Sequence, residues 1–357
     1  MTQSFSHDEL LRFKSRLATH AGALGFQQIG VAGVDLRADE ARLQQWLDEG
    51  RHGEMKFMQR HGLRRSRPAE LIPGTVRVVS LRMDCHAPDG AAAEDVLADG
   101  TRAYISRYAL GRDYHHILRR RLQRLATALE QDIGPFGYRA FVDSGPVMEK
   151  PLARNAGLGW IGKHTNLIHP KAGSWFVLGE LYTDLPLPVD APQHDHCGTC
   201  TACLPACPTG AITAPYQLDA RLCISYLTIE LHGPIPEPLR AAVGNRIFGC
   251  DDCQLACPWN KFAAAASDPG FKTRNGLDAP ALVDLFGWDE PRYLAMTEGS
   301  ALRRLGYGRF LRNVSVGLGN APTGADVVAA LASRRNDVDP VLREHIAWAL
   351  ARHHGGP

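Results

Sequence analysis

The sequence contains no long apolar stretch and no strong excess of charge of either sign. No apolar run approaches the roughly 18 residues that a membrane-spanning helix needs. Residues 1–17 show neither the basic and apolar regions of an export signal nor a twin-arginine pair. Lys and Arg together number 40 against 38 Asp and Glu, which leaves a formal net charge of +2. We therefore expect a cytoplasmic protein that enters no membrane, in which any polyanion site comes from uneven placement of charge.

Cysteine is nearly absent outside one short region. Eight of the nine cysteines lie between Cys197 and Cys257, and only Cys85 stands apart. In a reducing cytosol, clustered thiols indicate metal ligands before disulfides, and we interpret Cys85 as a buried free thiol. The remaining composition, 45% hydrophobic and 22% charged over 357 residues, is that of a globular protein with two or three domains. It excludes disordered and fibrous classes.

The first part of the chain shows alternating helical and extended patterns. Ser6 and Glu9 match a capping box before an apolar periodic segment, which predicts an opening helix. The later elements that we expect are a basic helix at 114–131 and extended segments at 26–34, 76–83, 138–142, 165–168 and 175–182. This alternation predicts an α/β domain over residues 1–190, ending in a proline-rich stretch.

The last part of the chain is expected to be helical. The segments LRNVSVGLGNA, from Leu311, and LREHIAWALA, from Leu342, repeat weakly at an interval of 31 residues, which is a period typical of helical repeats. They predict HEAT-like helix pairs over residues 263–357. A plain helical bundle is the alternative, because two copies do not establish an array. Residues 191–262, between the two parts, hold the cysteines.

The spacing of the cysteines matches that of iron–sulfur ligands. Cys197 opens the run C-x2-C-x2-C-x3-C-P, the bacterial ferredoxin pattern. Cys250 opens C-x2-C-x3-C-P, in which Ile247 occupies the place of a first cysteine and Cys223 is the remaining thiol. Because the fourth cysteine of each run ligates the other cluster, we predict two 4Fe–4S clusters. One takes Cys197, Cys200, Cys203 and Cys257, and the other takes Cys207, Cys223, Cys250 and Cys253.

Zinc is the rival interpretation of these thiols, but their spacing is not that of a zinc ribbon. Iron–sulfur clusters of this kind transfer single electrons and make no bonds with a substrate. We therefore expect the cysteine module to conduct electrons to chemistry elsewhere in the chain.

Two motifs in the first domain admit both a functional and a structural interpretation. Residues 157–162 spell G-x-G-x-x-G, but a dinucleotide site needs a strand before the glycines and a helix after them. Here the expected order is the reverse, so we interpret Gly157 as a helix C-cap. Asp143 follows an expected strand, a common position for site residues, and it is either a catalytic acid or a helix N-cap. Nearby polar candidates are Glu149, Lys163 and His164.

Positive charge is concentrated in two stretches. Residues 51–67 carry six Lys and Arg against one acid, and residues 102–124 carry seven Arg with three Tyr interleaved. Each stretch is either a solvated helix face or a phosphate-backbone site. In such a site, clustered Arg supplies affinity and aromatic rings stack on unpaired bases.

Several longer stretches together resemble the epoxyqueuosine reductase family. They are SRYALGRDYH at 106–115, VDSGPVMEKPLARNAGLGWIGKHTNLI at 142–168, CGTCTACLPACPTGAI at 197–212, CISYLTIELHGPIP at 223–236, GNRIFGCDDCQLACPWN at 244–260, EGSALRRLGYGRFLRN at 298–313 and HIAWAL at 345–350. The resemblance covers nearly the whole chain.

The resemblance implies a cobalamin- and iron–sulfur-dependent oxidoreductase. Members of the family reduce epoxyqueuosine to queuosine, the last step of queuosine biosynthesis, at the wobble position of tRNAs with GUN anticodons, those for Tyr, His, Asn and Asp. The resemblance makes Asp143 the proton donor and divides the cysteines into the same two sets. Because the family is similar to reductive dehalogenases, the implied fold is an α/β (α+β) cobalamin-binding domain, then a ferredoxin-like two-cluster module and a HEAT-like tail that contacts tRNA.

The expected cofactor and RNA contacts follow from position within the family. The motif D-x-H-x-x-G, which supplies a histidine as the lower ligand of cobalamin, is incomplete. Asp113 and His115 are present, but Leu118 replaces the glycine. We therefore expect base-off cobalamin without a histidine ligand. Since an acid must keep its proton until it is needed, we also expect a raised pKa for Asp143. Expected cobalamin contacts are Arg60, Arg107, Asp143, Lys163, Thr165, Ser225, Cys250 and Asp251. Expected tRNA contacts are Arg64, Arg65, Arg119, Arg303, Arg304 and Arg312.

Two other functions stay open from the sequence. One is a soluble, cobalamin-dependent reductive dehalogenase, against which the basic stretches and the missing export signal count. The other is a ferredoxin-like electron carrier or RNA-binding scaffold without a corrinoid. We expect an external low-potential electron donor, and a monomer, because the chain carries its own clusters.

Overall fold

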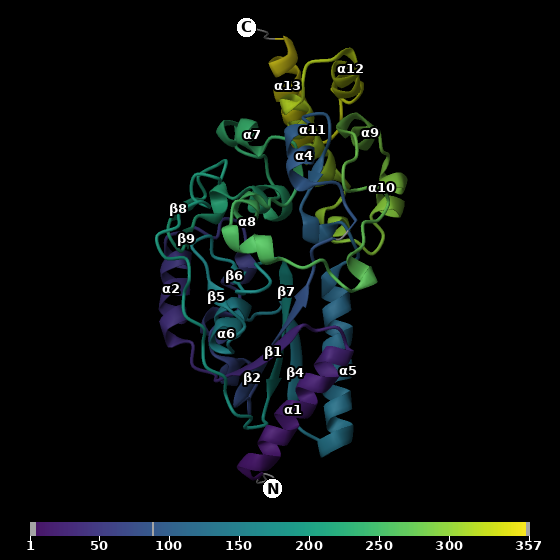
Figure 1. Cartoon of the computed structure of the whole chain (residues 1–357). Helices are drawn as coiled ribbons and strands as arrows, with labels where there is room; N and C mark the ends of the chain where they lie inside the picture. The colour runs from purple at the N-terminus through teal and green to yellow at the C-terminus, as the bar shows by residue number, and fades with distance from the viewer. Residues whose placement is uncertain (1–4, 88, 355–357) are drawn as a thin grey trace.

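The computed structural model describes residues 5–87 and 89–354. Figure 1 shows an elongated molecule, with the N-terminal helix at one end, a mixed sheet-and-helix half next to it, and a helical half that ends at the C-terminus. The cysteine-rich segment lies between these halves. In the described ranges, no helix is both long enough and apolar enough to cross a bilayer.

The N-terminal half is built on a four-stranded sheet. Its strand order is β1 (Gln28–Ala32), β2 (Arg77–Asp84), β7 (Phe176–Thr183) and β4 (Tyr138–Val142). All four strands lie in segments predicted to be extended, although β2 and β7 each run one residue past the predicted end. They are rich in Val, Leu and aromatic residues, which suit a pleated and half-buried surface. Every neighbouring pair is antiparallel. The domain is therefore of the α+β form of the expected class.

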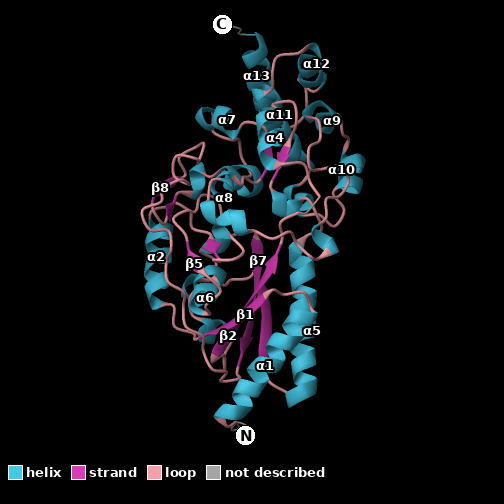
Figure 2. Ribbon diagram, viewed as in Figure 1, coloured by secondary structure: helices cyan, strands magenta, loops and turns pink. Residues whose placement is uncertain are grey.

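Helices cover both faces of this sheet (Figure 2). On one face, α1 (His7–Ala23) and α5 (Tyr114–Ile133) bury apolar side chains such as Leu17 and Leu122; each such burial contributes roughly 2 kcal/mol. The predicted capping box is present at α1, where Ser6 Oγ accepts from Glu9 N at 3.3 Å and Glu9 Oε2 accepts from Ser6 N at 2.8 Å.

The opposite face of the sheet is covered by α6 (Glu149–Asn155), with α2 (Arg37–Asp48) and α3 (Pro68–Leu71) beside it. The end of α6 approaches β1 so closely that a Cβ on Gly30 would lie 1.9 Å from Ala156 O. The strand therefore needs glycine at this position.

The glycine-rich segment 157–162 is not a dinucleotide loop. Helix α6 precedes it, Gly157 has a φ of +76°, and a two-stranded hairpin follows, β5 (Trp160–Ile161) and β6 (Leu167–Ile168). The structure thus agrees with the interpretation of Gly157 as a residue that ends a helix. Thr165, in the turn of the hairpin, has a φ of 67°.

The cysteine-rich segment contains only short elements. Besides two 3-10 helices (Ala220–Leu222 and Pro258–Phe262), they are β8 (Ile212–Ala214), β9 (Gln217–Leu218), a π-helix (Tyr226–Glu230), α7 (Glu237–Val243), β10 (Arg246–Phe248) and α8 (Asp252–Leu255). Strand β10 pairs in parallel with β3 (Tyr104–Ile105), near α4 (Ala93–Ala98). The pairing joins this segment to a part of the chain more than a hundred residues earlier.

The C-terminal half is helical, as predicted. Its helices are α9 (Leu282–Phe286), α10 (Glu290–Met296), α11 (Tyr307–Asn320), α12 (Ala325–Ser333) and α13 (Pro340–His354). The two segments with weak sequence similarity form α11 and α13, which pack on each other. Their core also includes Ile105 and Leu110 from the first part of the chain.

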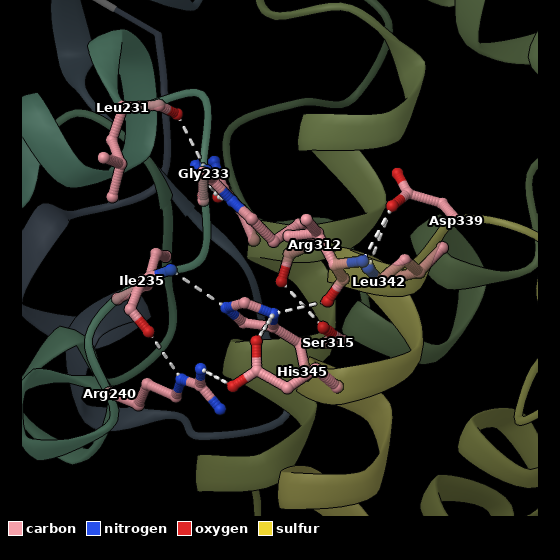
Figure 3. A network of polar contacts seen from close by, with 12 residues as sticks. Leu231, Gly233, Ile235, Arg240, Arg312, Ser315, Asp339, Leu342 and His345 are labelled. Carbon is pink, nitrogen blue, oxygen red and sulfur yellow. Dashed lines mark hydrogen bonds and ion pairs between the residues drawn. The ribbon is translucent and has the colours of Figure 1, made fainter. Parts of the chain in front are cut away.

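A buried polar network fastens α11 and α13 to the chain that follows the π-helix (Figure 3). The guanidinium of Arg312 donates to Leu227 O at 2.8 Å, Leu231 O at 2.8 Å and Gly233 O at 2.6 Å. Arg312 is only 1% exposed, so the expectation that it contacts tRNA is wrong. Its charge satisfies main-chain carbonyls instead.

Candidate active site between Asp143 and the cysteine loops

A cavity of about 360 Å³ lies where the sheet meets the cysteine-rich segment. One wall is formed by the segment after β4, the start of α6 and the β5–β6 hairpin, and the other wall by loops of residues 207–225 and 250–254. Asp143 lies on the first wall. On the second lie four cysteines, Cys207, Cys223, Cys250 and Cys253.

Asp143 is held at the end of a chain of polar contacts. Its Oδ2 accepts a hydrogen bond from the Tyr114 hydroxyl, and its Oδ1 lies 2.6 Å from His115 Nε2. The other ring nitrogen of His115 lies 2.6 Å from Asp113 Oδ1, and Asp113 Oδ2 accepts from Arg304 Nε at 2.9 Å. Asp113 also caps α5, which places Tyr114 and His115 at the start of that helix. Asp143 itself caps no described helix, since Met148 precedes α6.

The contacts of Asp143 decide its charge. Burial alone would raise its pKa, but the hydrogen bond and charge of His115, with the bond from Tyr114, outweigh burial and lower the pKa of Asp143 below its ordinary value. The expected raised pKa is therefore wrong. Burial alone would also lower the pKa of His115, but Asp113 and Asp143 raise it to about 9. At neutral pH the pair is a carboxylate and an imidazolium, and it holds one proton.

The cysteines fall into two spatial groups. Cys207, Cys223, Cys250 and Cys253 share the cavity wall. Cys257 lies in one apolar cluster with Cys197, Trp160 and Trp259, and the two indole rings meet edge to face at 5.0 Å. Of the remaining three, Cys85 and Cys203 are buried and Cys200 is exposed to solvent, and Cys85 also lines the cavity.

Comparisons with known proteins agree with this arrangement. The family model described as "Epoxyqueuosine reductase QueG, DUF1730" matches residues 65–144, and the "4Fe-4S double cluster binding domain" matches residues 196–260. An epoxyqueuosine reductase from Xanthomonas campestris pv. campestris is 59% identical over 339 residues, covering 95% of this chain and 96% of the relative. The chain belongs to the epoxyqueuosine reductase family. The protein is thus an oxidoreductase, as the resemblance predicted.

Other relatives support the same family assignment. The epoxyqueuosine reductase of Escherichia coli K12 is 54% identical over 329 residues, covering 92% of this chain and 86% of the relative. Among solved structures, the epoxyqueuosine reductase from Streptococcus thermophilus superposes with a TM-score of 0.86 at 26% identity, covering 96% of this chain and 91% of that one. A structure of the family with an epoxyqueuosine-modified tRNA-Tyr stem loop has a TM-score of 0.88 at 28% identity, with the same coverage.

Within this epoxyqueuosine reductase fold, the expected cobalamin contacts divide into two groups. Those that line the cavity are Asp143, Thr165, Ser225, Cys250 and Asp251, and those that do not are Arg60, Arg107 and Lys163. Lys163 Nζ donates to Gly198 O at 2.7 Å and Cys200 O at 2.8 Å, so it supports a cysteine loop instead. Arg107 is buried, and its guanidinium lies over the ring of Tyr104.

Tyr108 and Tyr114, two of the tyrosines interleaved in the second basic stretch, line the cavity. The cavity also contains polar residues for which the sequence assigned no role. They are Ser106, Lys150, Asn166, Ser174, Asp252 and Gln254. Most lie in the stretches that resemble the family, but no local spacing marks them as site residues. Membership in those stretches is the one signal that could have found them.

A second hollow, of about 1200 Å³, runs along α5 and β4 beside the cavity. Five arginines line it, Arg112, Arg119, Arg120, Arg124 and Arg139. We call this hollow the arginine groove. It reaches Ser144, next to Asp143, and Arg119 Nη2 lies 3.5 Å from Ser144 Oγ. The basic helix predicted at 114–131 thus presents most of its charge beside the active site.

The residues expected to contact tRNA differ in their exposure to solvent. Arg64, Arg119, Arg303 and Arg304 are exposed, although Arg304 is engaged with Asp113. Arg65 is 5% exposed and donates to Phe57 O at 2.8 Å and Val147 O at 3.3 Å. The expectation that Arg65 contacts tRNA is therefore wrong, because its guanidinium is used inside the domain.

Proposed function

We propose that this enzyme reduces the epoxide of epoxyqueuosine in tRNA to the alkene of queuosine, the last step of queuosine biosynthesis. The observation that carries the proposal is the single cavity with Asp143 on one wall and Cys207, Cys223, Cys250 and Cys253 on the other. Removing an epoxide oxygen as water takes two electrons and two protons, so an acid and an electron source must face one substrate.

The cysteines are proposed to hold two 4Fe–4S clusters in the sets predicted from their spacing. Cys257 of the second run lies in one cluster with Cys197, and Cys207 of the first run shares the cavity wall with Cys250 and Cys253. Both placements support the exchange of one ligand between the two runs. The cluster on the cavity wall would deliver electrons to the site. The other, beside exposed Cys200, would receive them from an external low-potential donor.

The cavity suits cobalamin in its chemistry. Its walls carry neutral donors and acceptors, Ser106, Asn166, Ser174, Ser225 and Gln254, which can pair with the amides at the edge of a corrin ring. When bound, reduced cobalamin supplies electrons at low potential. Both ring nitrogens of His115 face carboxylates, so this histidine is not free to bind cobalt. That engagement supports cobalamin without His115 as a ligand.

Asp143 and His115 are proposed to act together as the first proton donor. The bond from Tyr114 and the contact with His115 orient the carboxyl of Asp143 at the cavity wall. As negative charge develops on the epoxide oxygen, the shared proton passes from the pair to that oxygen. A paired carboxylate with a low pKa can thus act as a donor because the imidazolium beside it stores the proton.

The arginine groove is proposed to bind the anticodon arm. Its arginines can neutralise successive phosphates without reading sequence, and it ends at Ser144, so a flipped wobble base would enter the cavity beside Asp143. The tRNAs proposed are those with GUN anticodons. We further propose that the enzyme acts as a monomer in the cytoplasm.

Anaerobic turnover tests the proposal. Reconstituted protein, cobalamin and a low-potential reductant are incubated with tRNA from cells lacking this activity, and the nucleosides are analysed by mass spectrometry. Loss of one oxygen from epoxyqueuosine is expected, dependent on cobalamin and abolished by Asp143→Asn. Unchanged epoxyqueuosine, with clusters and cobalt both loaded, would refute it.

A further inference from the structure

The Asp143–His115 pair holds one proton, whereas the reaction consumes two. A second carboxyl, that of Glu149, lines the same cavity at the start of α6. Its Oε2 is buried and has no hydrogen-bond partner among the described residues. Its neighbour Lys150 forms no ion pair with it in the described part of the chain, and Lys150 Nζ donates instead to Thr165 O at 3.2 Å and Asn166 Oδ1 at 3.3 Å.

A third carboxyl, that of Glu180, provides an internal comparison. Glu180 lies in the middle of β7 opposite Ser80 and Phe141, on the same strand face as Leu178 and Tyr182, which pack against α6. It is 0% exposed, and neither of its carboxyl oxygens has a partner within residues 5–87 and 89–354. Glu180 does not line the cavity, so its carboxyl cannot reach a substrate there.

The groups around Glu149 favour its protonated form. Burial and the charge of Asp143 raise the pKa of Glu149 to about 8, against the opposing charges of Lys150 and His115. Glu180 and the Tyr114 hydroxyl, which also face Glu149, have raised pKa values and stay neutral. Glu149 thus carries a proton at neutral pH.

We propose that Glu149 supplies the second proton of the reaction, through the cavity that it shares with Asp143, after the Asp143–His115 pair has given its proton to the epoxide oxygen. In the balanced step, two C–O bonds break, one C=C bond forms and the oxygen leaves as water. The two electrons come from the external low-potential donor through the clusters. This inference rests on the proposed function and adds a residue to it.

The test compares Glu149→Gln with Glu180→Gln in the reconstituted enzyme. Each variant replaces a buried carboxyl with an amide of the same shape, and only Glu149 lines the cavity. We expect Glu149→Gln to lower kcat roughly 10²-fold with little change in KM, as for loss of a general acid, and to increase the solvent deuterium isotope effect. Glu180→Gln should retain most of kcat. Cluster content and thermal unfolding verify that both variants fold.

A second measurement is independent of turnover. Infrared spectra of the cluster-loaded enzyme without substrate should contain the carbonyl band of a protonated carboxyl that titrates near pH 8 and disappears in Glu149→Gln. Absence of that band, or full kcat in Glu149→Gln, overturns the inference while the wild-type activity stands. An inactive wild-type enzyme with loaded cofactors overturns the proposed function, and this inference with it.

Discussion

His115 Nε2 lies 2.6 Å from Asp143 Oδ1, so the carboxylate of Asp143 and the imidazolium of His115 form an ion pair. The contact exists because Asp113 caps α5 and binds the other ring nitrogen of His115. The residue that follows β4 and a residue in the first turn of α5 therefore form one ion pair. The acidity of the site belongs to the pair.

Replacing His115 by Gln should remove a pH-dependent part of stability. The pKa of His115 is raised to about 9 in the folded protein, so its stabilising contribution is complete below the unfolded value of about 6.5 and is lost as pH rises through about 9. Between these values, the free energy of unfolding of the wild type should fall by up to about 3 kcal/mol more than that of the variant. Urea unfolding at a series of pH values measures this, and equal slopes would contradict the pair.

Removing charge from the arginine groove should weaken tRNA binding in a salt-dependent way. Arg119→Ala and Arg124→Ala should each lower affinity and reduce the slope of log affinity against log salt concentration by about one, as for loss of one phosphate contact. Arg12→Ala, an exposed arginine on α1 outside the groove, is the matched control. An equal effect of all three variants would mean that the groove is not the binding surface.

Arg312→Ala should destabilise the protein without a specific effect on RNA. The change leaves two buried carbonyls and one part-buried carbonyl without their donor, at a cost of about 3 kcal/mol or more in the free energy of unfolding. Exposed Arg335 supplies the control, since Arg335→Ala should change stability by less than about 0.5 kcal/mol. Urea unfolding measures the cost. Full stability in Arg312→Ala, with lost tRNA binding, would restore Arg312 as an RNA contact.

The cobalt of bound cobalamin should lack a nitrogen ligand from the protein. His164 is the histidine to examine, because it lines the cavity and its Nε2 has no partner in the described part of the chain. Burial lowers the pKa of His164 to about 4, so its ring is neutral. Electron paramagnetic resonance of the Co(II) form should contain no nitrogen splitting. A splitting that disappears in His164→Ala would contradict the proposal that the cobalt has no histidine ligand.

Local sequence patterns predicted the helices and strands whose formation depends on residues close to one another in the chain. The capping box of Ser6 and Glu9, the four strands of the sheet, and α5, α11 and α13 are all present where the sequence indicates them. Helix capping and strand alternation act over a few residues, so they can be read directly. The antiparallel order of the sheet could not be predicted, since it depends on which strands meet.

The same limit applies to the arginines. Arg64 and Arg65 are adjacent in one basic stretch, yet Arg64 is exposed and Arg65 donates to Phe57 O and Val147 O inside the domain. In the same way, Arg303 is exposed and Arg312 is buried. Composition shows how much positive charge a segment carries, but packing decides which guanidinium groups reach solvent.

The sequence by itself determined which chemical groups this protein can use. The spacing of the cysteines from Cys197 onward and the motif around Asp143 are properties of the order of residues, so they are fixed before the chain folds. Only the tertiary structure decided which groups act on one another. It placed Asp143 in contact with His115, and this contact lowers the pKa of Asp143, for which the sequence predicted a raised value. It also placed Glu149 on the same cavity wall with its Oε2 buried. Charge states depend on burial and on neighbours brought from distant parts of the chain.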